Sequence, residues 1–138
     1  MRTLIEQECA MRLVVDPGHS IAVAAQLSYG PHDPYAVQIV FHTGSHGPVP
    51  WVFSRELLAQ GTLGPCGQGD VRIWPAGAGR RRVLYLELTS PDGRALLHAP
   101  AAVVERWLRR THQLVPPGQE AQLIDVDGEL CGLLGESA

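Results

Sequence analysis

Residues 29–58 constrain the fold of this chain more than any other part of its sequence. They read YGPHDPYAVQIVFHTGSHGPVPWVFSRELL, so turn-rich segments at residues 30–34 and 44–47 bracket an alternating apolar run. Period-two alternation is typical of a half-buried strand, and clusters of Gly, Pro, Asp and Ser are typical of the turns between strands. The stretch therefore predicts a tightly turned β-meander, and its polar residues lack the spacing of a common enzyme site.

The same alternation predicts strands along most of the chain. Pro50 removes a backbone donor, so the strand at residues 49–53 is expected to lie at a sheet edge or to start late. The Gly-rich residues 64–69 are expected to form a loop. In chain order, the seven predicted strands are residues 3–15, 21–27, 37–42, 49–53, 71–74, 84–88 and 94–97.

Helical signals follow the meander and the last predicted strand. A short helix is expected to begin after Ser54, a good N-cap, and Gly61 is its candidate C-cap. The clearest helix starts near Ala99, with Pro100 as its first helical residue. One side of this helix is apolar at helical spacing. The residues of that stripe are Val103, Val104, Trp107, Leu108 and Thr111.

A third helix is predicted over residues 125–134. Its apolar stripe is interrupted by Gly128 and Gly132, each of which weakens a helix by about 1 kcal/mol relative to Ala. This helix is therefore expected to need a partner surface. The count of seven strands and two or three helices predicts one α+β domain over residues 1–138, with residues 119–138 attached loosely.

Composition limits the possible functions. The chain has 138 residues, a net charge of −3 and only 18% charged residues, below the usual value of about 25%. A nucleic-acid-binding protein usually has a basic footprint, and no overall excess of basic residues exists here. The weakly charged composition, rich in Gly and Pro, favours self-association or docking onto another protein.

Targeting and redox signals indicate a soluble cytoplasmic protein. Glu6 and Glu8 lie where a signal peptide would need an apolar stretch, and no apolar run approaches the roughly 18 residues of a membrane span. Cys9, Cys66 and Cys131 are odd in number and widely spaced. They are expected to be reduced thiols, because no pair has the spacing of a zinc or redox motif.

Scattered His, Asp and Ser residues suggest chemistry only superficially. His42 and His46 flank a hairpin, and His32 and Asp33 lie between prolines, where Asp more often stabilises a turn. Ser45 is not followed by a helix and lacks the Gly two residues before it that a nucleophile elbow needs. We therefore expect no catalytic residue, no metal site and no cofactor.

Two arginine clusters are the candidate interaction sites. All eleven basic residues of the chain are Arg, which suits bidentate contacts with carboxylates. A solvated surface, an acidic protein partner and single-stranded nucleic acid are all consistent with such clusters, the last because Trp74 and Tyr85 flank the first cluster. The candidate residues are Arg80, Arg81, Arg82, Glu105, Arg106, Arg109 and Arg110.

Many short blocks of the chain, in one order, resemble the SsgA-like family of actinobacterial sporulation and cell-division regulators. The resemblance covers nearly the whole chain, although it is poor after Gly118. The blocks are LSY at 27–29, HDPYAV at 32–37, VFHTG at 40–44, WVFSRELL at 51–58, Gly61, GP at 64–65, GDVRIWP at 69–75, SPDG at 90–93, ALL at 95–97, APA at 99–101 and VPPG at 115–118.

The resemblance implies a fold, a function and partners. Its fold would be whirly-like, with two antiparallel sheets and helices, assembled as a trimer. The protein would be a non-enzymatic regulator of sporulation-specific septation, a scaffold that helps position or assemble the tubulin-like division protein FtsZ together with other family members. It would be cytoplasmic and recruited to the septum. No catalytic role is carried over to any residue.

Two functional hypotheses remain at this point. The first is the protein scaffold, and the second is a regulator that binds single-stranded nucleic acid, for which the implied fold and the cluster at Arg80–Arg82 are the motivation. Independently of the resemblance, the apolar edge near Trp51 and Val52 predicts a homo-oligomer, because an exposed apolar strand edge favours pairing with another chain.

Overall fold

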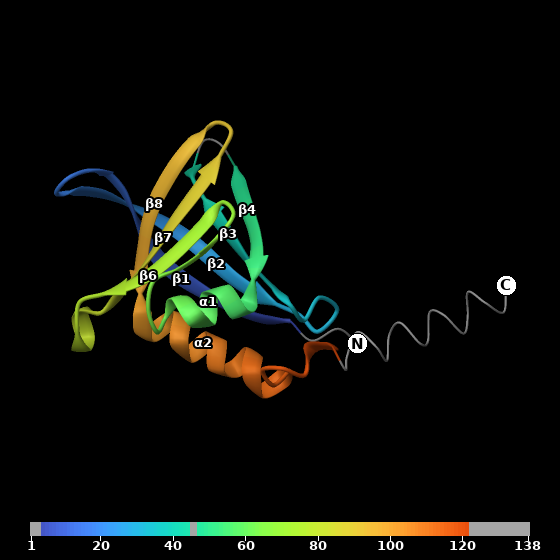
Figure 1. Cartoon of the computed structure of the whole chain (residues 1–138). Helices are drawn as coiled ribbons and strands as arrows, with labels where there is room; N and C mark the ends of the chain where they lie inside the picture. Colours follow the sequence, from blue (N-terminus) through green and yellow to red (C-terminus); the bar gives the residue numbers. More distant parts are fainter. Residues whose placement is uncertain (1–3, 45–46, 122–138) are drawn as a thin grey trace, which may run out of the picture.

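The chain folds around one curled antiparallel sheet. The computed structural model describes residues 4–44 and 47–121, to which all structural statements below refer. The sheet has eight strands in the order β4-β3-β2-β1-β8-β7-β6-β5, and Figure 1 shows how it curls. The strands are β1 (Ile5–Asp16), β2 (His19–Tyr29), β3 (Ala36–His42), β4 (Pro48–Ser54), β5 (Cys66–Gln68), β6 (Val71–Ala76), β7 (Val83–Ser90) and β8 (Gly93–Pro100).

Two α-helices cover one end of the curled sheet, as Figure 1 shows. Helix α1 (Arg55–Gly61) packs against β4, β5 and β6, whereas α2 (Ala101–Leu114) packs against β1, β7 and β8. A short 3-10 helix, η2 (Gly79–Arg81), joins β6 to β7. The α+β prediction is confirmed.

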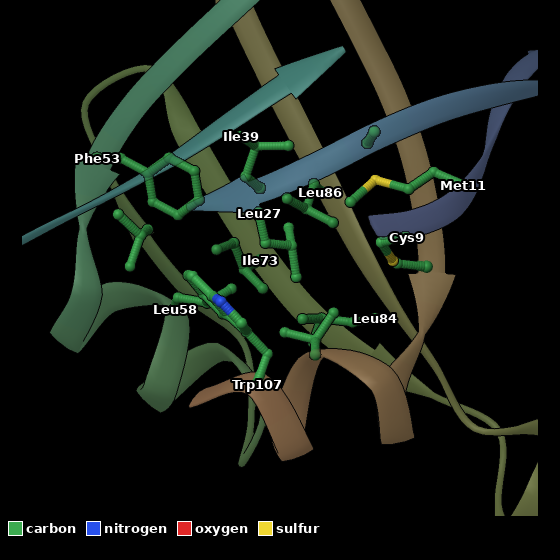
Figure 2. Close-up of a cluster of buried hydrophobic side chains, with 14 of the residues drawn as sticks. Cys9, Met11, Leu27, Ile39, Phe53, Leu58, Ile73, Leu84, Leu86 and Trp107 are labelled. Atoms are coloured by element: carbon green, nitrogen blue, oxygen red, sulfur yellow. The ribbon is translucent and has the colours of Figure 1, made fainter. Parts of the chain in front are cut away.

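The core lies between the concave face of the sheet and the helices. Figure 2 shows Trp107 of α2 pointing into a cluster of aliphatic side chains from the sheet and from α1. Trp107 is fully buried, and its Nε1 donates a hydrogen bond to the backbone oxygen of Ile5, at 2.9 Å. The other core side chains come mainly from alternate residues of the strands. They include Cys9, Met11, Leu27, Ile39, Phe53, Ile73, Leu84 and Leu86.

The sequence predicted the start of α1 correctly and misread its end. The Oγ of Ser54 accepts a hydrogen bond from the backbone N–H of Leu57 at 3.1 Å, which is the predicted N-cap. Gly61 is the last helical residue rather than the C-cap, a position that Thr62 occupies. A Cβ at Gly61 would clash with the side chain of Ile73. The glycine therefore permits close packing of α1 on β6, and it is not needed for a left-handed turn.

Three further predictions about the fold are wrong in detail. The strands form one sheet, not two, because β1 pairs with β8 and so joins the two meanders. Residues 64–69 are not all loop, since β5 pairs with β6 at Cys66–Gln68 and adds an eighth strand. Pro100 ends β8, and α2 begins one residue later. The predicted edge position of β4, which contains Pro50, is confirmed.

The β1–β2 hairpin continues past the body of the sheet as an arm, which Figure 1 shows in blue. The register of β1 with β8 includes Arg12 and Leu13, whereas β1 and β2 stay paired as far as Asp16 and His19. Val15 and Ile21 were predicted on the apolar faces of their strands, yet their side chains are more than half exposed. The arm thus has an apolar face with no covering element in the described chain.

The predicted helix at residues 125–134 lies outside the described residues, as does Cys131. Of the other two cysteines, Cys9 is a buried thiol and Cys66 a half-buried one. Burial raises the pKa of the Cys9 thiol to about 11, so this side chain behaves as a small apolar residue at neutral pH.

Candidate protein-interaction surface

Helix α2 presents one apolar side and one arginine side, as its sequence predicted. Buried residues recur at helical spacing along the side that faces the sheet, and the Trp107 hydrogen bond to Ile5 fixes the rotation of the helix. This rotation leaves Arg106, Arg109 and Arg110 exposed on the opposite side. The helix therefore holds three guanidinium groups on a rigid element.

The structure separates the predicted site residues into two groups. Arg82 and Glu105 form an ion pair, and Arg82 also donates a hydrogen bond to the backbone oxygen of Thr62. These contacts join the β6–β7 connection to both helices, so Arg82 and Glu105 hold the surface together. Arg80 and Arg81 are exposed in η2, on the same connection. The exposed candidates are thus the two arginines of η2 and the three of α2.

A groove between the two helices is lined by Arg109, one of these exposed arginines. This α1–α2 groove has a volume of about 310 Å³. Leu63, at the end of α1, is 87% exposed, which is the highest value among the large apolar residues of the described chain. The residues that line the groove are Ala59, Thr62, Leu63, Arg82, Glu105, Leu108, Arg109 and His112. An apolar groove with a cationic edge fits an amphipathic segment that carries acidic groups.

The charge of the groove depends on its arginines and not on its histidine. Burial lowers the pKa of His112, and the nearby Arg55 guanidinium lowers it further. His112 is therefore neutral at physiological pH. Within the described part of the chain, Arg106, Arg109 and Arg110 take part in none of the ion pairs. Their charges are available to a ligand.

Arg55 is a buried residue that the sequence analysis did not identify. It is only 1% exposed, and its Nη1 donates hydrogen bonds to the backbone oxygens of Thr111, at 3.1 Å, and Val115, at 2.8 Å. Its guanidinium lies 4.9 Å from the centroid of the Tyr29 ring. The accepting carbonyls belong to the last turn of α2 and to its C-cap, Val115, so Arg55 ties the end of α2 to the first turn of α1.

Glu120 completes this buried cluster. Its Oε2 lies 3.3 Å from Nη2 of Arg55, at an ion-pair distance but without the alignment of a hydrogen bond. Burial opposes ionisation of Glu120, but backbone hydrogen bonds and the Arg55 charge outweigh it and lower the carboxyl pKa. The chain that follows α2 is thus fixed beside the start of α1. A sequence signal existed, because Arg55 is three residues before Leu58 and so lies on the same side of α1.

The other sequence candidates do not gather into a reactive centre. His32, Asp33 and His42 are exposed at the ends of strands and in a turn. Among residues 4–44 and 47–121, no three His, Cys, Asp or Glu side chains come together as a metal-binding group. Within the same residues, neither α-helix has the length and apolar character that crossing a membrane requires.

The chain was compared with known protein families and with curated relatives. Residues 23–120 match the profile of a family described as the Streptomyces sporulation and cell division protein SsgA. The sporulation-specific cell division protein SsgB of Streptomyces coelicolor is 47% identical over 137 residues, with 99% of this chain and 100% of the relative covered. SsgB of Thermobifida fusca is 43% identical over 128 residues, with 93% of each chain covered.

Two solved structures have the same fold. A structure of SsgB from a study of longitudinal cell division during sporulation of Streptomyces coelicolor has a TM-score of 0.84 at 47% identity, covering 89% of this chain and 97% of the other. The SsgA-like sporulation-specific cell division protein of Thermobifida fusca has a TM-score of 0.85 at 43% identity, covering 94% of both chains. The resemblance found in the sequence is confirmed, and this chain belongs to the SsgA family of sporulation and cell division proteins.

Proposed function

We propose that this protein is a non-enzymatic scaffold of sporulation-specific cell division, which binds a division protein through the α1–α2 groove and the arginines beside it. Its family and its relatives' names support a role in sporulation and division. The observation that carries the choice of surface is the exposure of Leu63 in a groove that Arg109 also lines, on a helix whose Arg106 and Arg110 are exposed as well. In this proposal the partner is FtsZ or another member of the family, and binding occurs at the septum.

Reversing the charge of α2 tests the surface. The variant Arg106→Glu/Arg109→Glu/Arg110→Glu is expected to weaken binding to FtsZ of the same cell by at least about tenfold at low salt, which is 1.4 kcal/mol. The reason is that charges at the edge of an interface attract a complementary partner and govern its rate of association. Biolayer interferometry with immobilised FtsZ and with other family members measures this change.

The control for this experiment is Arg94→Glu. Arg94 is exposed on β8 and has an ion-pair distance of 3.7 Å to Glu87, away from the two helices. Its replacement is expected to leave binding unchanged. Equal binding by the α2 variant and the wild type, or equal losses in the α2 and Arg94 variants, overturns the assignment of the surface.

We also propose that the protein works as a homo-oligomer, with a trimer as the family arrangement. The supporting observation is apolar exposure at two places on the sheet: Val15 and Ile21 on the arm, and Val52 on the edge strand β4. Sedimentation equilibrium at micromolar concentration is expected to give a mass above that of one chain. The variant Val15→Ser/Ile21→Ser is expected to shift the mass toward the monomer, whereas Leu114→Ser on α2 is not. A wild type that is strictly monomeric contradicts the proposal.

A second candidate function, binding of single-stranded nucleic acid, has one specific observation in its favour. Trp74 and Tyr85 stack across β6 and β7 with centroids 5.5 Å apart, and His98 of β8 meets Tyr85 edge-on at 5.3 Å. Aromatic rows of this kind can stack on bases. Filter binding of a mixed-sequence oligonucleotide is then expected to weaken as salt rises and in Tyr85→Ala. Absence of binding at low salt removes this candidate.

A further inference from the structure

The acidic residues of this chain are unevenly distributed. Residues 122–138 contain four of the fourteen, Asp125, Asp127, Glu129 and Glu136, and no basic residue. The remaining part of the chain has ten acidic residues and all eleven arginines, so it is close to neutral. A strongly acidic C-terminal segment thus follows a domain whose exposed α2 arginines have no ion-pair partner within the described residues.

The same segment also has apolar residues at helical spacing, which could pack into a groove. The predicted helix at residues 125–134 has an apolar stripe of Val126, Leu130, Leu133 and Leu134, and its two glycines mean that it needs a partner surface. The α1–α2 groove offers exposed apolar carbon from Leu63 together with the charge of Arg109. The two surfaces therefore match in both apolar character and charge.

The buried Arg55–Glu120 pair sets where this segment begins. Arg55 contacts the last turn of α2 and holds Glu120 beside it, so the chain enters residue 122 next to the end of the groove lined by His112. From His112 back to Glu105 the helix rises about 10 Å. A chain covers this length with three or four extended residues, at about 3.3 Å each. The seventeen residues from 122 to 138 are ample.

We propose that residues 122–138 dock into the α1–α2 groove of their own chain and cover the surface that a partner would use. The segment would be an autoinhibitory tail, held by its acidic groups against Arg106, Arg109 and Arg110 and by its apolar stripe against Leu63. A partner must then displace the tail before it can bind. This consequence rests on the proposed function, whereas the docking itself does not.

A spin label on Cys131 tests the docking in the full-length protein. Cys9 is only 3% exposed, so we expect the label not to react with it, and Cys66→Ser removes the half-buried thiol. Paramagnetic relaxation enhancement is then measured on the backbone amides. Loss of the Leu63 and Arg109 signals with the oxidised label, and their return on reduction, is the expected result. The amide of Gly93, the first residue of β8, is expected to keep its intensity.

Charge variants of the tail give the matched comparison. Asp125→Asn/Asp127→Asn/Glu129→Gln is expected to restore most of the Leu63 signal, whereas Glu136→Gln, which lies beyond the apolar stripe, is not. A mixture of spin-labelled protein with isotope-labelled, spin-free protein detects binding between two copies. Signal loss in that mixture, signal loss on another face, or no localised loss overturns the proposal.

Failure of the docking can be separated from failure of the proposed function. If the tail docks as expected and its neutralisation strengthens binding of FtsZ in interferometry, both are supported. If the tail docks but neutralisation leaves FtsZ binding unchanged, the groove is not the partner site and the proposed surface is wrong. If the tail does not dock, the α2 charge-reversal experiment still decides the proposed surface by itself.

Discussion

An Arg55→Ala substitution is expected to lower the free energy of unfolding by about 3–5 kcal/mol, because it removes one partner of a buried ion pair. Glu120, which is 9% exposed, then loses its ion-pair partner. The Val115 carbonyl loses the Arg55 donor, and the Thr111 carbonyl keeps only the backbone N–H of Val115. The native structure must pay the cost of burying these groups without compensation. Urea unfolding followed by circular dichroism measures the change.

Arg94→Ala provides the control for Arg55→Ala. The Arg94 side chain is 68% exposed, and its contact with Glu87 is that of a surface ion pair, worth at most about 1 kcal/mol. The intermediate variant Glu120→Gln keeps the shape of the side chain and is expected to cost less than Arg55→Ala, since Arg55 retains its two backbone acceptors. Equal stability of the Arg55 and Arg94 variants contradicts the account of Arg55 as an anchor of α2.

Local features of the fold could be predicted from sequence because each has a local physical cause. The N-cap at Ser54 depends on one side chain and one nearby amide, and the edge position of β4 depends on the donor that Pro50 lacks. The buried side of α2 follows from helical spacing around Trp107. The family was identified from many short sequence blocks that occur in the same order. A single periodic pattern does not identify a family.

The arrangement of strands in one sheet could not be predicted in the same way. Alternation indicates that a segment is a strand, but it does not say which distant strand lies beside it. The pairing of Leu13 with Leu97 joins residues more than eighty positions apart and turns two predicted sheets into one. Strand β5 was missed because Cys66–Gln68 has no apolar alternation, and its place depends on pairing with β6.

The candidate surface was predicted only as a set of residues. The sequence identified all seven, but nothing local indicated that Arg82 pairs with Glu105 and that Arg80 and Arg81 stay exposed. The groove was also missed, since it exists only where Leu63 of the α1 end meets Arg109 of α2. The ion pair and the groove both depend on contacts between elements that are distant in the sequence, so a pattern of neighbouring residues does not predict them.

Trp107→Ala is expected to destabilise the protein by about 3–5 kcal/mol, the usual cost of removing a large aromatic side chain from a core. Trp107 is 0% exposed and is the largest fully buried side chain in the described chain, and it points from α2 into the cluster in Figure 2. Its loss leaves a cavity among Leu58, Ile73 and Leu84. Thermal and urea unfolding measure the effect, with Arg106→Ala on the exposed side of α2 as a control expected within about 0.5 kcal/mol of the wild type.

Trp107→Phe separates packing from the hydrogen bond. Phenylalanine keeps a ring in the core but cannot donate to the oxygen of Ile5, so it is expected to cost less than Trp107→Ala and more than the control. Trp107 holds the middle of α2 and Arg55 holds its end, so together they fix which residues face solvent. Weakened FtsZ binding by Trp107→Phe, with its arginines intact and its fold retained, would mean that the rotation of α2 contributes to recognition. Unchanged binding would mean that Arg55 and the remaining core contacts suffice to hold Arg106, Arg109 and Arg110 in place.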